Sequence, residues 1–234
     1  FRLVDLPGTY SLAADSPEEE VAGAFLQSGQ ADAVIVVVDA SCLRRGLILA
    51  LQLRQQTQRL VLCVNLMDEA ARRGITPQTE RLGQLLDVPV VATAARSGKG
   101  LAELRHQAAE VCRREPWEDG WRLTYAPPVE AALGLLETGM SRRRAVALLW
   151  GSPPTEGEQS LWQRAQQRLG ALSGQALRDS LTASVVALAE EIGRQCVRCA
   201  GPDPHAPDRR LDRLLTSRFT GFPAMLLLLG LVFY

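Results

Sequence analysis

The sequence has no excess of either charge, since Lys plus Arg total 26 and Asp plus Glu total 26. The basic field expected of a protein that binds nucleic acid non-specifically is therefore missing, and we expect no nucleic-acid partner. Cysteine is also scarce: there are five, an odd number in no regular framework. This pattern favours a reducing compartment over a secreted disulfide scaffold.

Two further features are missing. The chain starts at Phe1 with neither an initiator methionine nor a signal peptide, so we expect a fragment whose upstream part is absent. There is also no Gly-x-x-x-x-Gly-Lys-Ser/Thr phosphate loop. Around Gly98-Lys99-Gly100, Thr93 stands in place of the first glycine and Gly100 in place of the Ser or Thr.

Strand-like and helical runs alternate in the first half of the chain. We expect strands just before Asp5 and at 33–38, 60–64 and 88–93, and helices at 17–28, 46–56, 77–86 and 101–113. Strands separated by helices pair in parallel through right-handed crossovers. The pattern therefore predicts an α/β domain with a doubly wound sheet, of the partial P-loop GTPase type, over residues 1–115.

The second half carries apolar residues at helical spacing and no strand-like run. Helices are expected at 129–136, 141–149, 158–169 and 175–199, which predicts a small all-α domain over residues 116–207. Arg142-Arg143-Arg144 fits a solvated helix start, with an anionic partner as the alternative.

The terminal segment, 208–234, is basic first and then uncharged from Phe222 to Tyr234. A helix over that uncharged stretch would rise about 20 Å, less than the hydrocarbon core of about 30 Å. We therefore expect the start of a first transmembrane helix, or else a buried helix. The arginines before it place residues 1–220 in the cytoplasm by the positive-inside rule.

The first candidate motif is Asp5-Leu6-Pro7-Gly8. A carboxylate at the end of a strand can hold Mg²⁺ through a water molecule, which suits Asp5. Gly8 has no Cβ, so its backbone N–H can approach a terminal phosphate. The same four residues also make an ordinary turn sequence, and both interpretations stay open.

The second and third motifs follow later strands. In Asn65-Leu66-Met67-Asp68, the Asp68 carboxylate can accept two hydrogen bonds from guanine, while Asn65 ties neighbouring loops together. The alternative is that Asn65 caps a helix and Asp68 is a solvated acid in its first turn. Thr93-Ala94-Ala95 then offers backbone N–H groups to the oxygen of the base. Because parallel strands end at one edge, we expect all three motifs to meet there.

These motifs, with Val37-Val38-Asp39-Ala40-Ser41, Gly98–Leu101 and Leu211–Leu215, resemble the GTP-binding domain of the ferrous iron transport protein B (FeoB) family. The resemblance implies GTP or GDP as ligand and Mg²⁺ held through water. It implies a metal role for Asp5 and the following cofactor-binding residues: Asp5, Leu6, Pro7, Gly8, Asn65, Met67, Asp68, Thr93, Ala94 and Ala95. It implies no catalytic side chain, because Thr9 stands where many GTPases carry a water-orienting glutamine.

The resemblance also implies what the complete protein does. GTP hydrolysis would drive Fe²⁺ uptake through a multi-pass protein of the cell inner (plasma) membrane, with the lipid bilayer as a partner and a homo-oligomer as an option. This chain would supply the cytoplasmic GTPase and helical parts, inactive without the phosphate loop. The alternatives are a soluble GTPase of ribosome assembly and a non-hydrolysing, membrane-attached regulatory module.

The cysteine pair and the two histidines fit structural roles better than chemical ones. Cys196 and Cys199 form a Cys-x-x-Cys pair with no second pair at ligand spacing, so we expect reduced thiols, with a transient iron contact as the alternative. His106 and His205 are expected to be structural or solvated.

Overall fold

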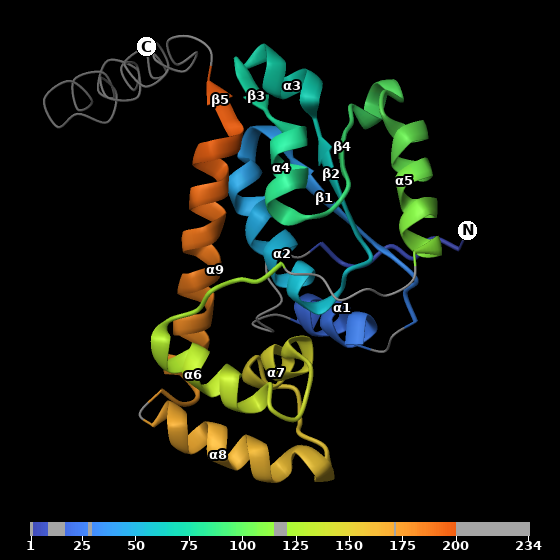
Figure 1. Ribbon diagram of the computed structural model, residues 1–234. Helices are drawn as coiled ribbons and strands as arrows, with labels where there is room; N and C mark the ends of the chain where they lie inside the picture. The colour runs from blue at the N-terminus through green and yellow to red at the C-terminus, as the bar shows by residue number, and fades with distance from the viewer. Residues whose placement is uncertain (1, 9–16, 28–29, 115–120, 171, 200–234) are drawn as a thin grey trace, which may run out of the picture.

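The structure is a computed structural model that describes residues 2–8, 17–27, 30–114, 121–170 and 172–199 (Figure 1). The predictions for Thr9, His205 and the terminal segment 208–234 lie outside these residues. No helix within the described ranges is long and apolar enough to cross a membrane.

A parallel sheet lies at the centre of the α/β part. Its three strands are ordered β1 (Val34–Asp39), β2 (Leu60–Asn65) and β4 (Val90–Ala92), with Val34 opposite Leu60 and Asp39 opposite Asn65. Leu60–Val64 of the central strand are all buried. This agrees with the continuous apolar run in the sequence, because a strand covered on both faces needs no polar alternation.

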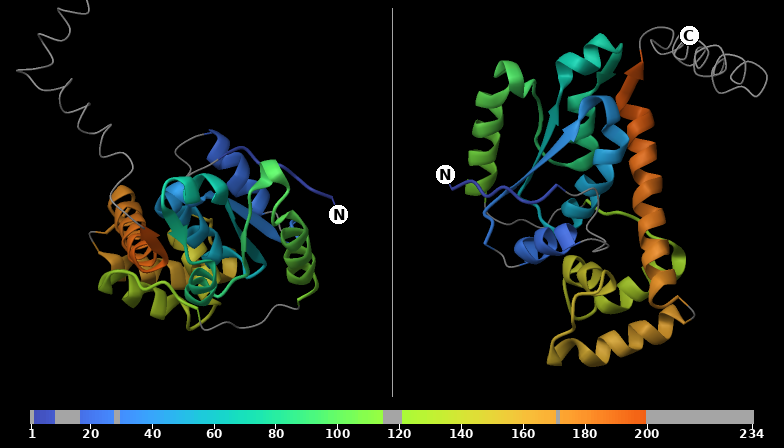
Figure 2. Two further views of the ribbon diagram at one scale, coloured as in Figure 1. Left: turned by 90° about the horizontal axis from the view of Figure 1, so that it is seen from above. Right: turned by 180° about the vertical axis from the view of Figure 1, so that it is seen from behind.

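Helices cover both faces of this sheet, as the doubly wound prediction requires. Leu60, Leu62 and Val64 join the main hydrophobic cluster beneath α2 (Leu43–Gln56) and α4 (Thr79–Leu86). Val61 packs on the other face with Val91 and with Val111 of α5 (Leu101–Arg113). Seen from above, the sheet lies between α5 and the layer that contains α2 and α4 (Figure 2). The predicted α/β fold class is confirmed.

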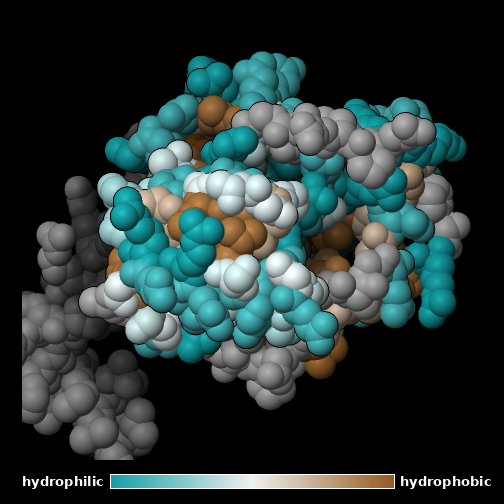
Figure 3. Space-filling model, turned by 60° about the horizontal axis from the view of Figure 1, so that its bottom comes forward, coloured by the Kyte–Doolittle hydropathy of each residue, from teal (hydrophilic) through white to brown (hydrophobic). Residues whose placement is uncertain are grey.

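The helical part consists of α6 (Pro127–Leu136), α7 (Arg142–Leu149), α8 (Gln159–Leu169) and the long α9 (Gln175–Cys196). Its outer surface, viewed from below, is mostly hydrophilic with small hydrophobic patches (Figure 3). Helix α9 leaves this part and runs back along α2 and α4 (Figure 1). It therefore contributes to both halves of the molecule.

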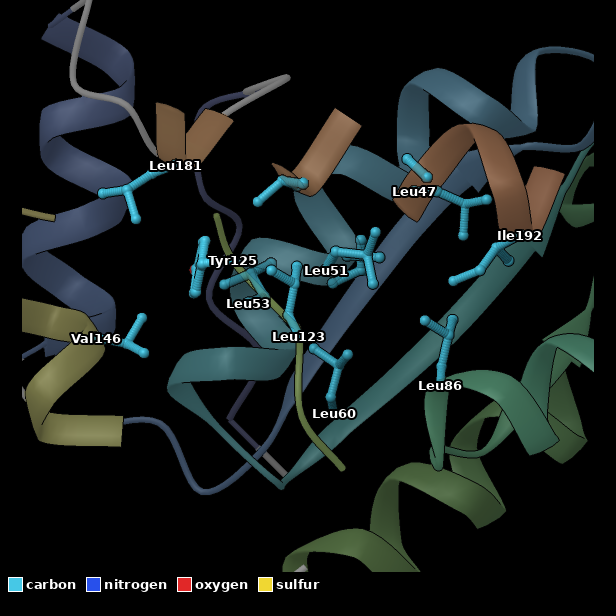
Figure 4. Packing of buried hydrophobic residues seen from close by; sticks show 14 of the residues in the cluster. Leu47, Leu51, Leu53, Leu60, Leu86, Leu123, Tyr125, Val146, Leu181 and Ile192 are labelled. Atoms are coloured by element: carbon cyan, nitrogen blue, oxygen red, sulfur yellow. The ribbon is translucent and has the colours of Figure 1, made fainter. Parts of the chain in front are cut away.

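One hydrophobic cluster runs through both halves. In Figure 4, Tyr125, Val146 and Leu181 lie at one end of the labelled set, while Leu47 and Ile192 lie at the other. Leu181 and Ile192 belong to the same helix, α9, and are 0% and 3% exposed. The predicted boundary between 1–115 and 116–207 remains a prediction, but the apolar core crosses it.

Several elements differ from the sequence prediction. Residues 2–8 form no strand, because nothing in the described chain pairs with them and a lone extended segment leaves its backbone groups to water. The prediction that the second half contains no strand was also wrong. Val197–Cys199 form β5, antiparallel to β3 (Ile75–Pro77), and these three-residue strands are too short to leave a periodic signal.

The remaining elements are short or lie near helix ends. Helix α1 covers Pro17–Gln27, α3 covers Met67–Arg72, and the 3-10 turns η1, η2 and η3 cover Ala40–Cys42, Ala95–Ser97 and Glu156–Glu158. The prediction that the arginines at the start of α7 are solvated was wrong for Arg142 and Arg144. Arg142 bonds Glu130 and Glu137 at 2.8 and 3.2 Å, and Arg144 bonds Glu158 at 2.7 Å, so both guanidiniums join helices within the fold.

Candidate functional site

Asn65 ties together two loops at the carboxyl edge of the sheet. Its Oδ1 atom accepts a hydrogen bond from the Thr93 hydroxyl at 3.0 Å and another from the Ala95 backbone N–H at 3.1 Å. Thr93 follows β4, so the tie joins the ends of two neighbouring parallel strands. The predicted tie between loops is therefore present, and Asn65 does not cap a helix.

The backbone turns sharply directly after Asn65. Leu66 has φ of 62°, in the left-handed region, and stands at the N-cap position of α3 with no side-chain cap. A non-glycine residue rarely adopts this conformation, and such residues are concentrated at functional sites. Leu66 is also one of the exposed large hydrophobic residues, at 37%. The turn directs the start of α3 across the end of β2.

Asp68 lies in the first turn of α3, with its side chain 48% exposed. Its nearest cation is Arg72, at 3.9 Å on the same helix, an exposed pair of the kind that contributes little to stability. The carboxylate is therefore accessible to a ligand. Its position in the first turn of α3 also agrees with the alternative interpretation, in which Asp68 is a solvated acid at a helix start. The backbone N–H of Met67 donates to the Thr93 carbonyl at 3.2 Å and fixes α3 against the third motif.

The loop after β4 is folded back on itself. The backbone N–H of Ala94 donates to the Lys99 carbonyl at 3.0 Å, which closes the loop around η2. Gly100 ends it with φ of +82°, and a Cβ there would overlap the carbonyl oxygen of Ala92. Only glycine fits this position. Ala94 is buried and Ala95 is exposed, so the loop offers its backbone to solvent beside Asn65.

Cys63 lies beneath these two loops and was not identified from the sequence. Its Sγ is 3.2 Å from the Thr93 hydroxyl, and the residue is 3% exposed. Burial raises the pKa of its thiol, which holds the group in its neutral form. The sequence signal that could have identified Cys63 is the two-residue period of a strand, because this period places residues 63 and 65 on the same face of β2.

The first motif does not lie beside the other two. Residues 2–8 cross the sheet near its amino end, away from α3 (Figures 1 and 2). They make no hydrogen bond with other residues of the described ranges. The structure thus brings Asn65, Met67, Asp68, Thr93, Ala94 and Ala95 together at one edge, and leaves Asp5, Leu6, Pro7 and Gly8 apart from them.

Two other candidates from the sequence, His106 and Cys196, show no features of a ligand or metal site. His106 is exposed on α5. Cys196 is 0% exposed, and burial raises the pKa of its thiol, so the sulfur is not held as the thiolate that metals bind. No cluster of three or more His, Cys, Asp or Glu side chains suited to a metal occurs within the described residues. The role of Cys199 stays a prediction.

The donors and acceptors at this edge suit a polar planar ring. The amide nitrogen of Asn65 makes no hydrogen bond to other described residues, so it can donate to a ligand. The exposed Asp68 carboxylate can accept two bonds, and the Ala95 loop adds backbone groups. The residues present therefore fit the base of a nucleotide. Phosphate-binding groups are not part of this cluster.

The fold defines an α/β domain of the GTPase type with a helical companion. A family profile described as "Ferrous iron transport protein B" matches residues 1–108. The chain is therefore similar to the ferrous iron transport protein B family, and the profile match is confined to the α/β part.

Relatives and solved structures agree with this placement. The "Fe(2+) transporter FeoB" of Staphylococcus aureus (strain COL) is 26% identical over 255 residues, covering 99% of this chain and 37% of the relative. That of Helicobacter pylori (strain J99) is 44% identical over 95 residues, covering 41% of this chain and 15% of the relative. The chain therefore spans well under half the length of these relatives.

The structural likeness covers most of the chain. The cytosolic domain of the T. maritima FeoB iron transporter in its GMPPNP form superimposes with a TM-score of 0.68 at 26% identity, covering 83% of this chain and 79% of that chain. Its GDP form II gives a TM-score of 0.66 at 27% identity with the same coverage.

Proposed function

We propose that the edge formed by Asn65–Asp68 and Thr93–Ala95 binds the base of a guanine nucleotide. The observation that carries the proposal is the double hydrogen bond to Asn65 Oδ1 from Thr93 and Ala95, which joins the two loops and leaves the amide nitrogen turned to other partners. The T. maritima FeoB domain was solved in GMPPNP and GDP forms, and that likeness supports the same ligand here.

Asp68 is the residue that selects guanine. Guanine carries a ring N–H and an exocyclic amine side by side, and a carboxylate accepts from both, whereas adenine lacks this donor pair. Asp68 is exposed at the start of α3, and its only ion pair among the described residues is the long contact with Arg72. Breaking the ion pair with Arg72 costs little free energy, so the Asp68 carboxylate can turn to the base.

The phosphate end of the nucleotide requires groups beyond this edge. Asp5 would hold Mg²⁺ through water, and the Gly8 backbone N–H would approach the terminal phosphate, as in the resembled domain. Both residues lie in a segment without hydrogen bonds to the other described residues, so its movement to the carboxyl edge breaks none of these. Mg²⁺ would supply charge neutralisation at the phosphates.

The complete protein would couple this site to the uptake of Fe²⁺ across the cell membrane. The curated relatives are named Fe(2+) transporters, and the chain spans 37% of the S. aureus protein, so the transport step belongs to parts not contained in this sequence. The matched structures are cytosolic domains, which supports a cytoplasmic place for this part.

Changing Asp68 to Asn tests the proposal. The new amide would present an N–H where guanine carries a donor, so GTP affinity should fall about 10- to 100-fold, as expected for loss of a charged hydrogen-bond partner. Affinity for xanthosine triphosphate, whose ring offers an oxygen in place of the amine, should rise. Titration of the complete protein with both nucleotides measures the preference, and Asp179→Asn on the exposed face of α9 is the matched control.

The same variant tests the link to transport. In cells or vesicles that contain the complete protein, Fe²⁺ uptake by the Asp68→Asn form should become dependent on xanthosine triphosphate. An unchanged preference for GTP would overturn the role of Asp68. A changed preference without any change in uptake would overturn the coupling to iron.

A further inference from the structure

A chain of three polar side chains runs from the interior of the sheet to the proposed base site. Cys63 Sγ lies 3.2 Å from Thr93 Oγ1, and Thr93 Oγ1 lies 3.0 Å from Asn65 Oδ1. Cys63 and Thr93 are 3% and 1% exposed, so water does not compete for either group. The buried end of the chain is a thiol, which is a weak donor.

The direction of every hydrogen bond in this chain is fixed. The backbone N–H of Ala95 can only donate, so the Asn65 atom 3.1 Å from it must be the oxygen rather than the amide nitrogen. That oxygen can only accept, so the Thr93 hydroxyl must donate its single proton to it. The remaining contact of that hydroxyl therefore needs a donor, and only the Cys63 thiol can supply the proton.

We propose that Cys63 is a positioning residue for the guanine site, whose thiol proton locks the Thr93 hydroxyl and thereby the orientation of the Asn65 amide. The inference rests on the proposed binding of a guanine nucleotide at this edge. The pKa of the buried thiol is raised, which keeps the proton on sulfur. No contact between Cys63 and the ligand is required.

The consequence is a preorganised donor. With Oδ1 held by Thr93 and Ala95, the amide nitrogen of Asn65 is left for the ligand, and the loop after β4 is held against the end of β2. Without the thiol proton, the Thr93 hydroxyl can turn toward other acceptors, and Asn65 can flip. A ligand would then bear the cost of ordering these groups on binding.

The test compares Cys63→Ala, which removes the donor, with Cys63→Ser, which keeps one. Cys42→Ala removes an exposed cysteine and is the matched control. The first readout is amide hydrogen exchange at Ala95 in this chain without nucleotide. Exchange should become about 3- to 10-fold faster in Cys63→Ala, as expected for one neutral hydrogen bond, and should be restored toward the original rate in Cys63→Ser. Exchange at the Leu181 amide, far from the site, corrects for global stability.

The second readout is the dissociation rate of fluorescently labelled GDP from the complete protein. Release should be about 3- to 10-fold faster in Cys63→Ala and near the original rate in Cys63→Ser and Cys42→Ala. Equal exchange at Ala95 in all variants would overturn the inference even if GDP binds. If the unmodified protein binds no GDP, the proposed function fails, whereas altered exchange at Ala95 would still support the positioning by Cys63.

Discussion

At the scale of single residues, the edge of the sheet is shaped by positions where few side chains fit. Leu66 and Gly100 both have positive φ, and they flank the two loops that Asn65 joins. Leu66 adopts a conformation that costs a leucine energy, and Gly100 takes one that glycine adopts freely. These two turns set where the start of α3 and the loop after β4 lie.

Gly100→Ala should disrupt this loop. The left-handed φ alone costs about 1–2 kcal/mol for a residue with a Cβ, and the overlap with the Ala92 carbonyl forces the backbone to shift as well. Urea denaturation should therefore show a loss larger than that value. Gly98→Ala is the control, because Gly98 has φ of +76° but nothing within 4 Å of an added Cβ. Equal losses in both variants would contradict the proposed contact.

Sequence reasoning identified the residues at this edge but not all of their connections. Asn65, Thr93 and Ala95 were named from their places after strands, and the tie by Asn65 was expected. The thiol of Cys63 was missed because a cysteine inside an apolar strand resembles any small core residue. The position of residues 2–8 was also missed, since an apolar run before Asp5 predicts a strand whether or not a neighbour is present to pair with it.

At the scale of elements, helix α2 packs unusually close to the sheet. A Cβ added at Gly46 would lie 2.5 Å from Val38 Cγ1 and 2.6 Å from Val38 Cβ. The glycine therefore permits a helix–strand approach that any other residue would prevent. The sequence predicted a helix from this same glycine onward but offered no reason for it, because the contact joins residues on two elements.

Gly46→Ala should destabilise the protein by about 1–3 kcal/mol, the usual cost of overpacking a close contact. Gly134→Ala is the matched control, since Gly134 also lies inside a helix but has nothing within 4 Å of an added Cβ. That variant should gain about 0.5–1 kcal/mol from helix propensity. Chemical denaturation of both variants measures the difference, and a gain at Gly46 would contradict the close approach.

At the scale of the whole molecule, α9 makes the α/β and helical parts share one core. The main hydrophobic cluster includes Leu62 of the sheet, Leu133 of α6 and Leu181 of α9. The small β3–β5 ribbon adds a second link, and the backbone N–H of Gln78 donates to the Cys196 carbonyl at 2.7 Å beside it. The end of α9 is thus fastened to the segment that follows α3.

Leu181→Ala should lower the stability of both parts together. Removing a fully buried leucine costs about 2–5 kcal/mol, and because one core is shared, sheet and helical part should lose structure at the same denaturant concentration. Hydrogen exchange in α8 follows the helical part, and hydrogen exchange in β2 follows the sheet. Two separate transitions would contradict a single cooperative unit.

The sequence by itself determined strands β1, β2 and β4, helices α1, α2, α4 and α5, the helical character of the second half, and the residues that meet at the carboxyl edge of the sheet. These follow from short-range patterns, because side-chain period and turn chemistry depend on residues close together along the chain. Only the tertiary structure decided which face of β2 joins which cluster, the hydrogen-bond chain from Cys63 through Thr93 to Asn65, and the pairing of β3 with β5. Those contacts join residues far apart in the sequence, and their distances are set by how whole elements pack.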